Sequence, residues 1–244
     1  MTGTDSSAAP ISPLAIPPHA RTLVLFGGSF DPPHLAHTSL PALVSAALGP
    51  DAAVVYIPAA RSPHKDAPGT PAHHRLAMLR LALHGGPGLI WTDELDRTPP
   101  GGASYTVDTV RRARHVLDAA GQAHVGLRLL FGADQALAFH RWKQPHDILQ
   151  LAQPLVLLRA PATDAQRLLE SLARSGEWST REMDLWRRGT HTAAGLAQLP
   201  HASTDVRAAA AAGANLAGMV SPAVAQYIAE HGLYRASAKN ADSH

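Results

Sequence analysis

Two histidines three residues apart, His34 and His37, follow a glycine-containing turn near the start of the chain. The turn occupies residues 27–33, with the sequence GGSFDPP, and follows the apolar run 23–26. Apolar residues from Leu40 onward recur at helical spacing, so this region predicts a strand, a turn and a helix. Such a turn lets the backbone approach phosphates, and the helix N-terminus favours anions. Both imidazoles would share one face of the first helical turn, where they could act on a nucleotide phosphate.

Two other interpretations of this pair stay open. The chain has 15 histidines, so His34 and His37 could be ordinary residues on a helix surface. They could also supply two ligands to a metal ion, but a zinc site needs three or four, and the sequence does not identify the others. The glycine turn before them favours the contact with phosphate.

The composition is that of a globular protein, with 244 residues of which 45% are hydrophobic. The net charge is +2 and no block is rich in Lys or Arg, which disfavours nucleic-acid binding. There is no cysteine, which excludes disulfides and thiolate catalysis and fits a cytoplasmic protein. We see no signal-peptide pattern and no apolar run near the ~20 residues of a membrane helix, so no membrane partner is expected. The oligomeric state is not indicated.

Strands and helices are expected to alternate along the chain. Apolar runs predict strands at 23–26, 53–57, 89–91, 127–131 and 155–158. Helical spacing predicts helices at 75–83, 106–120, 165–173 and 223–230. This alternation is typical of an α/β fold with a doubly wound parallel sheet, in which ligands bind at the carboxyl ends of the strands. The glycine turn, Pro58 and Gly132 would lie at that edge.

We expect a single domain over residues 21–235. Residues 1–20 and 236–244 show no periodicity and are expected to be flexible tails. Residues 162–200 contain Trp178, Met183 and Trp186 in a polar stretch, for which surface packing is the expected role.

Residues 27–37, GGSFDPPHLAH, resemble the signature of nucleotidyltransferases with a His-x-Gly-His motif, and most of all that of the bacterial nicotinate-nucleotide adenylyltransferases. Further matching blocks follow in the family's order, and several ordered blocks are more specific than one. They are PAARSPHK at 58–65, Arg75, SYTVDT at 104–109, GAD at 132–134 with Trp142, and STDVR at 203–207. Two positions depart from the family pattern, Ala36 in place of Gly and Ala202 in place of Ser. Alanine at position 36 would be benign in a helix, but it would displace ATP if the nucleotide packed there.

The resemblance implies a Rossmann-like nucleotidyltransferase fold. It also implies transfer of AMP from ATP to nicotinate mononucleotide in NAD biosynthesis, with Mg²⁺ carried on ATP and no metal site built by the protein. The catalytic residues that it implies are His34, His37, Lys65 and Arg207. The ATP-binding residues that it implies are Gly27, Gly28, Ser29, Phe30, His34, His37, Gly132, Asp134, Ser203, Thr204 and Arg207. Those for nicotinate mononucleotide are Ser29, His64, Lys65, Thr106 and Trp142.

Each block also has an ordinary structural explanation. Lys65 could be a solvated surface residue, Trp142 a core aromatic, and Asp31 a turn residue that bonds its own backbone. Serine, threonine and aspartate at helix starts are commonly N-caps. This explanation applies to Ser104, Thr106, Asp134, Ser203 and Thr204.

Three other functions remain open from the residues. A related transferase could use another phosphorylated acceptor, such as phosphopantetheine or a polyol phosphate, although the blocks with Thr106 and Trp142 favour nicotinate. A nucleotide-binding module without catalysis could serve a regulatory role, and Ala36 and Ala202 are the hints of such decay. A histidine-rich metal binder is supported by composition alone.

Overall fold

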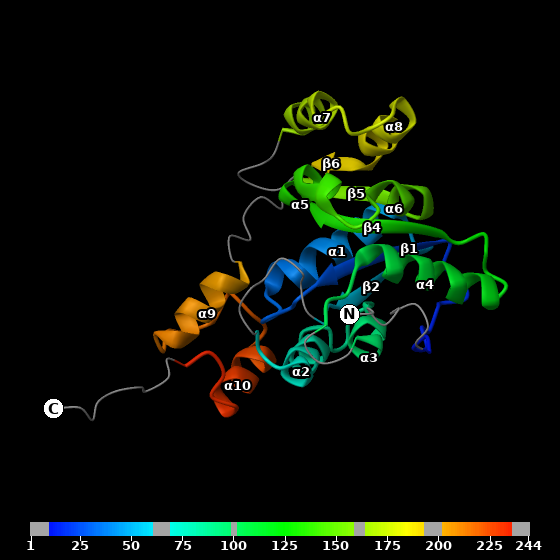
Figure 1. Ribbon diagram of the computed structural model, residues 1–244. Helices are drawn as coiled ribbons and strands as arrows, with labels where there is room; N and C mark the ends of the chain where they lie inside the picture. Colours follow the sequence, from blue (N-terminus) through cyan, green and yellow to red (C-terminus); the bar gives the residue numbers. More distant parts are fainter. Residues whose placement is uncertain (1–9, 61–68, 99–101, 159–163, 193–201, 236–244) are drawn as a thin grey trace. The chain divides into compact units, whose positions relative to one another are not determined.

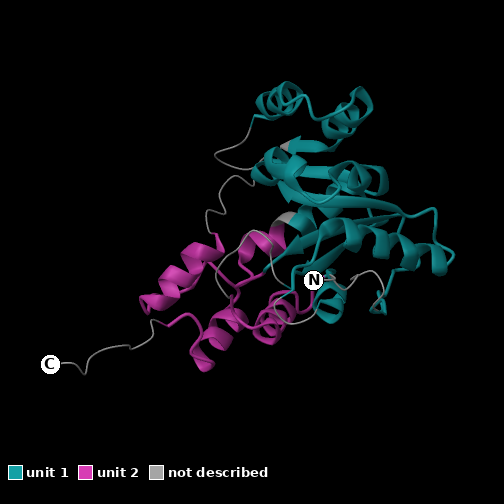
Figure 2. Ribbon diagram, viewed as in Figure 1, with its two compact units in different colours: residues 1–29, 40–67, 87–198 teal, residues 30–39, 68–86, 199–244 magenta. Residues whose placement is uncertain are grey.

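The computed structural model describes residues 10–60, 69–98, 102–158, 164–192 and 202–235. The chain forms two compact units (Figure 2). Unit 1 comprises residues 1–29, 40–67 and 87–198, and unit 2 comprises residues 30–39, 68–86 and 199–244. The expectation of a single domain over 21–235 stays a prediction. Within the described ranges, no helix is long and apolar enough to cross a membrane.

Unit 1 is built on a six-stranded parallel sheet with the order β3-β2-β1-β4-β5-β6 (Figure 1). Its strands are β1 (Thr22–Gly28), β2 (Ala52–Pro58), β3 (Leu89–Ile90), β4 (Gly126–Gly132), β5 (Gln153–Leu158) and β6 (Thr190–Thr192). The order runs outward from β1 in both directions, which is the doubly wound arrangement of Rossmann-like folds. The predicted fold class is confirmed.

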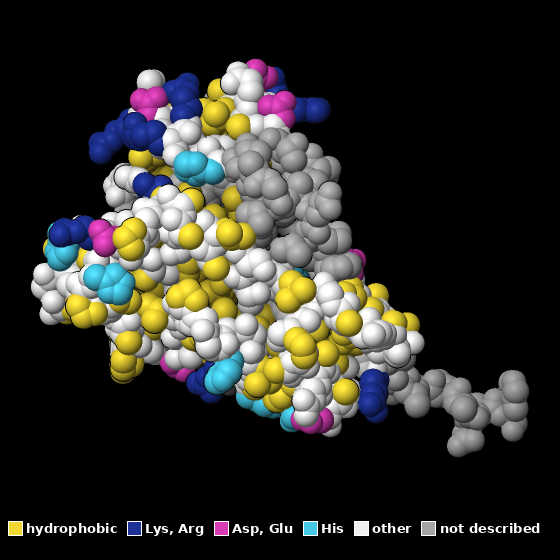
Figure 3. Space-filling model, turned by 180° about the vertical axis from the view of Figure 1, so that it is seen from behind, with side chains coloured by type: hydrophobic (Ala, Val, Ile, Leu, Met, Phe, Trp, Pro, Cys, Tyr) yellow, Lys and Arg dark blue, Asp and Glu magenta, His cyan; other side chains and the backbone are white. Residues whose placement is uncertain are grey.

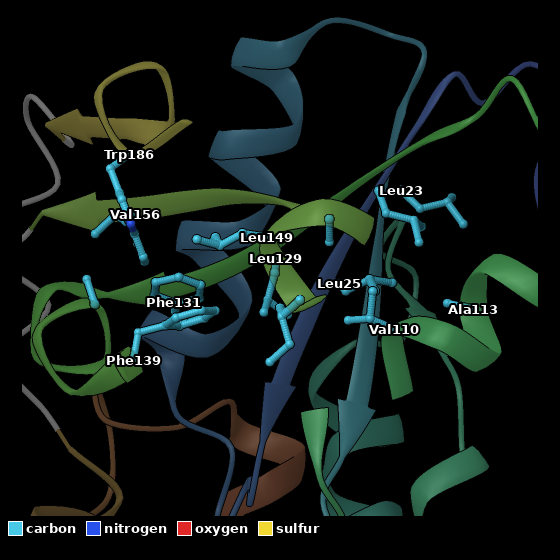
Figure 4. Close-up of a cluster of buried hydrophobic side chains, with 14 of the residues drawn as sticks. Leu23, Leu25, Val110, Ala113, Leu129, Phe131, Phe139, Leu149, Val156 and Trp186 are labelled. Carbon is cyan, nitrogen blue, oxygen red and sulfur yellow. The ribbon is translucent and has the colours of Figure 1, made fainter. Parts of the chain in front are cut away.

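Apolar side chains on both faces of this sheet are buried. Leu25 and Phe131 share one core with helical side chains such as Val110 (Figure 4). Val24 and Leu130, which point to the opposite face because strand residues alternate, are also at most 4% exposed. The helices of unit 1 are α3 (Asp93–Arg97), α4 (Thr106–Ala119), α5 (Ala133–Ala138), η1 (Phe139–Arg141), α6 (Pro145–Leu151), α7 (Ala165–Arg174), α8 (Thr180–Gly189) and most of α1 (Leu35–Leu48).

Unit 2 consists of the first residues of α1 together with three helices and their loops. The helices are α2 (Ala72–Ala82), α9 (Ser203–Ala211) and α10 (Pro222–Glu230). They pack around a small apolar core of Met78, Val206, Leu216, Val220, Val224 and Ile228. The helix predicted over 223–230 is present as α10, in which the Ser221 hydroxyl accepts the Val224 N–H as the N-cap and Pro222 is the first helical residue.

Residues 10–20 belong to unit 1 and make specific contacts. Ile11, Leu14 and Ile16 pack against the core of this unit. The Trp91 indole N–H donates to the Ser12 carbonyl at 2.9 Å. The expected N-terminal tail therefore does not extend over these residues, and its remainder, 1–9, lies outside the described part of the chain, as do residues 236–244.

Trp178, Met183 and Trp186, which were expected to pack on the surface, belong to the core of unit 1 instead. The side chain of Trp186 is fully buried and Met183 is 6% exposed, because α8 lies against β5 and leads into the edge strand β6. Gly189 makes this packing possible, since a Cβ there would lie 2.0 Å from the Pro154 carbonyl oxygen. Charged side chains of both signs gather over α7 and α8 (Figure 3), where Arg187 pairs with Asp184 at 2.6 Å.

Candidate active site

The carboxyl edge of the sheet in unit 1 carries the glycines expected at the nucleotide. Gly28 pairs with Pro58 at the ends of β1 and β2, and Gly132 ends β4, the other neighbour of β1. The strand order reverses at β1, and ligands of doubly wound sheets bind at such a switch point. A Cβ at Gly27 or Gly132 would meet no described atom within 4 Å, so this edge is open to a close approach. The expected position of these three strand ends is confirmed.

The loop before α1 and the two histidines lie in unit 2. The rings of His34 and His37 are 3.7 Å apart between centroids, and Phe30 contacts the His37 ring edge-on at 5.2 Å. The His34 backbone N–H donates to Nδ1 of His37 at 3.2 Å. Because Nδ1 accepts this hydrogen bond, the neutral ring carries its hydrogen on Nε2. The His37 imidazole is thus fixed as an Nε2–H donor.

Ala36 lies within the first turn of α1 and is 5% exposed. Its backbone is not among those with positive φ, so the position does not need glycine. The structure therefore supports the benign interpretation of this departure from the family pattern.

Unit 2 brings the block at 203–207 to the histidine loop. The Ser203 hydroxyl donates to the Pro32 carbonyl at 3.0 Å, and Nη1 of Arg207 donates to the Asp31 carbonyl at 2.8 Å. Ser203 is the first residue of α9 and Ala202 is its N-cap, so the alternative role of Ser203 and Thr204 as N-caps is wrong. The first N–H groups of a helix have no intrahelical acceptor and can meet an anion.

The block at 104–109 is anchored in unit 1 by a buried carboxylate that the sequence analysis did not identify. Glu94 accepts hydrogen bonds from the hydroxyls of Ser104 and Thr109, each at 2.5 Å. Ser104 is therefore not a cap, and the N-cap of α4 is Tyr105, which leaves Thr106 as the first helical residue. Burial raises the pKa of Glu94 above its usual range, although both hydroxyls and the charge of Arg97 act in the opposite direction.

A second buried pair completes this network. Asp93 accepts two hydrogen bonds from Arg112, each at 2.8 Å. Arg97 donates to the Thr109 hydroxyl at 2.7 Å, and its side chain is fully buried. The signal for this network is the sequence DELDR at 93–97, in which acidic and basic residues three or four apart share one helix face.

The residue after Trp142 contacts the block at 104–109. The ring of Trp142 itself stacks on Phe139, with centroids 4.7 Å apart. The next residue, Lys143, lies over the Tyr105 ring at 4.6 Å and 3.5 Å from the Asp108 carboxylate. Unit 1 therefore brings the two blocks expected at nicotinate mononucleotide together. Trp142 is half-buried, so it has a core contact as well as an exposed part.

The remaining expected site residues either make few described contacts or lie outside the described residues. Gly132, not Asp134, is the N-cap of the short helix α5, and Asp134 is exposed in its first turn. Ser29 follows β1 directly. His64 and Lys65 lie outside the described residues, as does most of the block at 58–65.

A separate cavity of about 780 Å³ lies in unit 1 at the amino ends of the strands. Its lining includes Thr22, Gly126 and Gln153, the first residues of β1, β4 and β5, together with Arg128 and Arg181. Parallel strands bind their ligands at the opposite edge, so this cavity is not the expected substrate site.

Comparison with known proteins agrees with this geometry. The cytidylyltransferase-like family model matches residues 25–208. A probable nicotinate-nucleotide adenylyltransferase of Stenotrophomonas maltophilia is 36% identical over 87% of this chain and 96% of its own. One of Gemmatimonas aurantiaca is also 36% identical, over 87% and 92% of the two chains.

Solved structures show the same fold. The nicotinic acid mononucleotide adenylyltransferase of Plasmodium falciparum, complexed with APC, superposes with a TM-score of 0.65 at 14% identity, over 88% of this chain and 97% of that one. A putative nicotinate-nucleotide adenylyltransferase of Vibrio parahaemolyticus gives a TM-score of 0.57 at 15% identity, over 88% and 96%. The chain belongs to the cytidylyltransferase-like family and, within it, to the nicotinate-nucleotide adenylyltransferases.

Proposed function

We propose that this chain transfers the AMP group of ATP to nicotinate mononucleotide, giving deamido-NAD and pyrophosphate. The observation that carries the proposal is the pair His34 and His37, which follows a loop whose Asp31 and Pro32 carbonyls accept hydrogen bonds from the block at 203–207. Family membership supports a nucleotide substrate, and the identity of the acceptor is the part that an experiment must decide.

The reaction needs no covalent intermediate on the protein. A phosphate oxygen of nicotinate mononucleotide attacks the α-phosphorus of ATP in line, and the bond from this phosphorus to the bridging oxygen of pyrophosphate breaks. Negative charge grows on the α-phosphate and the leaving group. Nε2–H of His37, with His34, donates to those oxygens, and Arg207 adds a fixed positive charge. Lys65 is proposed as a second cation.

The two substrates are proposed to use different groups. Gly27, Gly28, Ser29 and Phe30 bind the ATP phosphates, with Ser203 and Thr204 offering N–H groups at the start of α9. Gly132 and Asp134 are proposed to lie at the adenosine. Nicotinate mononucleotide is proposed to contact Ser29 and His64, with its ring against Trp142. The first N–H groups of α4, near Thr106, have no intrahelical acceptor and suit the carboxylate of nicotinate better than the amide of nicotinamide.

A divalent metal accompanies ATP in this class of enzyme, and we propose Mg²⁺. In the described ranges, no group of three or more His, Asp or Glu side chains is arranged to hold a metal ion. We propose that ATP phosphates and water bind the Mg²⁺, where it would neutralise the charge of pyrophosphate. The protein side chains then bind and orient the two nucleotides and stabilise the charge that grows on the α-phosphate.

Pyrophosphate release from ATP with Mg²⁺ and a panel of acceptors tests the proposal. The panel contains nicotinate mononucleotide, nicotinamide mononucleotide, phosphopantetheine and a polyol phosphate. We expect the highest kcat/KM with nicotinate mononucleotide and a lower value with the nicotinamide form. Activity with phosphopantetheine or the polyol phosphate, and none with nicotinate mononucleotide, would assign the chain to a related transferase.

A further inference from the structure

We infer that Asp31 and Tyr234 are positioning residues for catalysis: the Tyr234 hydroxyl holds the Asp31 carboxylate, and this contact fixes the loop that carries His34 and His37. The two residues are 203 positions apart in the sequence and both belong to unit 2. The inference rests on the proposed function for its kinetic consequences, but not for its structural ones.

Asp31 is the centre of the contact. Its carboxylate accepts the Tyr234 hydroxyl at 2.7 Å through Oδ1 and the Thr70 backbone N–H at 3.2 Å through Oδ2. Position 69 is a glycine, and a Cβ there would lie 2.9 Å from Oδ2. Burial favours the neutral acid, but the hydrogen bonds from Thr70 and Tyr234 and the charge of Arg207 outweigh it and lower the pKa of Asp31. The carboxylate is therefore an ionised acceptor, which strengthens both bonds.

The backbone on either side of Asp31 is held as well. Arg207 donates to the Asp31 carbonyl and Ser203 to the Pro32 carbonyl. The first N–H of α1, that of Leu35, donates to the Met219 carbonyl at 2.9 Å. Among the described residues, four contacts from residues 203–234 thus fix the loop from Asp31 to Leu35. Of these four, only the hydrogen bond from the Tyr234 hydroxyl reaches the Asp31 side chain.

Tyr234 and Phe30, the residue before Asp31, have an uncommon backbone conformation. Phe30 and Tyr234 have φ of +46° and +63°, a region that residues with a Cβ rarely adopt. Such conformations persist only where the surrounding structure holds them, and they gather at functional sites. Phe30 contacts the His37 ring. A shift of the Asp31 loop would therefore reach His37 through Phe30 as well as through the start of α1.

The chain contains a matched control for Tyr234. Tyr227, on α10 in the same unit, places its hydroxyl 2.9 Å from Nδ1 of His74. Removal of either hydroxyl breaks a hydrogen bond to a side chain of unit 2. Only the bond of Tyr234 leads to the histidine loop. Tyr227→Phe thus controls for the general loss of a tyrosine hydroxyl.

The experiment compares Tyr234→Phe, Asp31→Asn and Tyr227→Phe in the full chain. We expect Tyr234→Phe and Asp31→Asn to lower kcat by roughly 10- to 100-fold, since small misplacements of catalytic groups have effects of this size. KM for both substrates should change by less than about 3-fold if only the transition state is affected. Tyr227→Phe should keep wild-type kcat.

Nitrogen NMR of the histidine rings gives a readout that does not depend on the reaction. In the wild type the His37 ring should show an Nε2–H tautomer, and Tyr234→Phe should shift or broaden its signals while Tyr227→Phe leaves them unchanged. Unchanged His37 signals and unchanged kcat in Tyr234→Phe would overturn the inference, and so would equal kcat losses in both tyrosine variants. If the wild type releases no pyrophosphate with any acceptor, the proposed function fails, and the NMR comparison alone decides the inference.

Discussion

The His34 backbone N–H lies 3.2 Å from Nδ1 of His37, and this single contact determines which ring nitrogen of His37 can face a substrate. Since Nδ1 is an acceptor here, Nε2 carries the hydrogen and is the ring nitrogen that would donate to a phosphate oxygen. In catalytic histidines, the hydrogen bond made by one ring nitrogen commonly determines whether the other nitrogen carries the proton.

Replacement of His37 by alanine should therefore affect the chemical step. We expect kcat to fall about 10²- to 10³-fold, as when one preorganised donor to a growing negative charge is lost. The dissociation constant of ATP should change little, because the donor acts mainly in the transition state. Steady-state kinetics and equilibrium titration measure the two quantities. His124→Ala, at an exposed turn before β4, is the control. A near-normal kcat in His37→Ala would return His37 to the ordinary surface histidines.

Ala36→Gly tests the departure from the family pattern. Position 36 is helical, and glycine is less favourable than alanine in a helix by about 0.5–1 kcal/mol. We expect the variant to be less stable by about that amount, with kcat/KM within about 2-fold of the wild type. Urea unfolding and steady-state kinetics check this. A large gain in ATP affinity in the glycine variant would show instead that the alanine methyl displaces the nucleotide.

Much of the fold could be predicted from the sequence, because long apolar runs and helical periodicity report burial directly. The runs at 23–26 and 127–131 correspond to β1 and β4, and the pattern from Thr106 corresponds to α4. The shorter elements α3, α5 and β6 have too few residues for any periodicity to be visible. The burial of Trp186 could not be predicted either, because it depends on α8 lying against β5.

The candidate site, like the fold, could be predicted only in part from the sequence. The histidine pair could be found from residue types and spacing, and the block at 203–207 from the resemblance to the family. Their mutual contacts could not, because Arg207 and Asp31 are 176 positions apart and meet only through the packing of unit 2. Sequence reasoning treated Asp31 as a turn residue that bonds its own backbone, whereas its carboxylate binds Thr70 and Tyr234. Partners at such separations are decided by tertiary structure.

Glu94 should make stability depend on pH with a defined sign. Its pKa in the folded state is raised above the ordinary 4.5 by burial, so the folded state holds this proton more tightly than the unfolded state. The contribution of Glu94 to the free energy of unfolding is therefore highest at low pH. It falls as the pH rises from about 4.5 through the raised pKa. Compared with Glu94→Gln, the wild type should lose stability over that range in urea unfolding.

Glu182 provides the control for this measurement. Burial acts to raise its pKa, but the hydrogen bonds from Ser179 and His146 outweigh it and lower the pKa. The stability contributed by Glu182 is thus present above its ordinary pKa and is lost as pH falls, which is the opposite slope. Equal slopes for the Glu94→Gln and Glu182→Gln comparisons would contradict the assignment of a raised pKa to Glu94.

Trp142 could act in packing, in substrate binding or in both. Its ring packs on Phe139, and the proposed function places the same ring against nicotinate. Trp142→Ala removes both contacts. Since the side chain is half-buried, we expect a stability loss of roughly 2 kcal/mol, about half that of a fully buried aromatic residue. Stacking of a base on an aromatic ring is worth about 1–3 kcal/mol, so by analogy KM for nicotinate mononucleotide should rise roughly 5- to 150-fold while ATP binding changes little.

Trp178→Ala is the matched comparison, because Trp178 belongs to the same aromatic cluster, with its ring 6.0 Å from that of Phe139, but has no proposed contact with substrate. It should lower the melting temperature without a selective change in KM for nicotinate mononucleotide. Thermal melts and separate titrations of the two substrates distinguish the variants. If Trp142→Ala and Trp178→Ala lower stability alike and raise both KM values in parallel, Trp142 is a core residue only, and the nicotinate ring must be held by other groups.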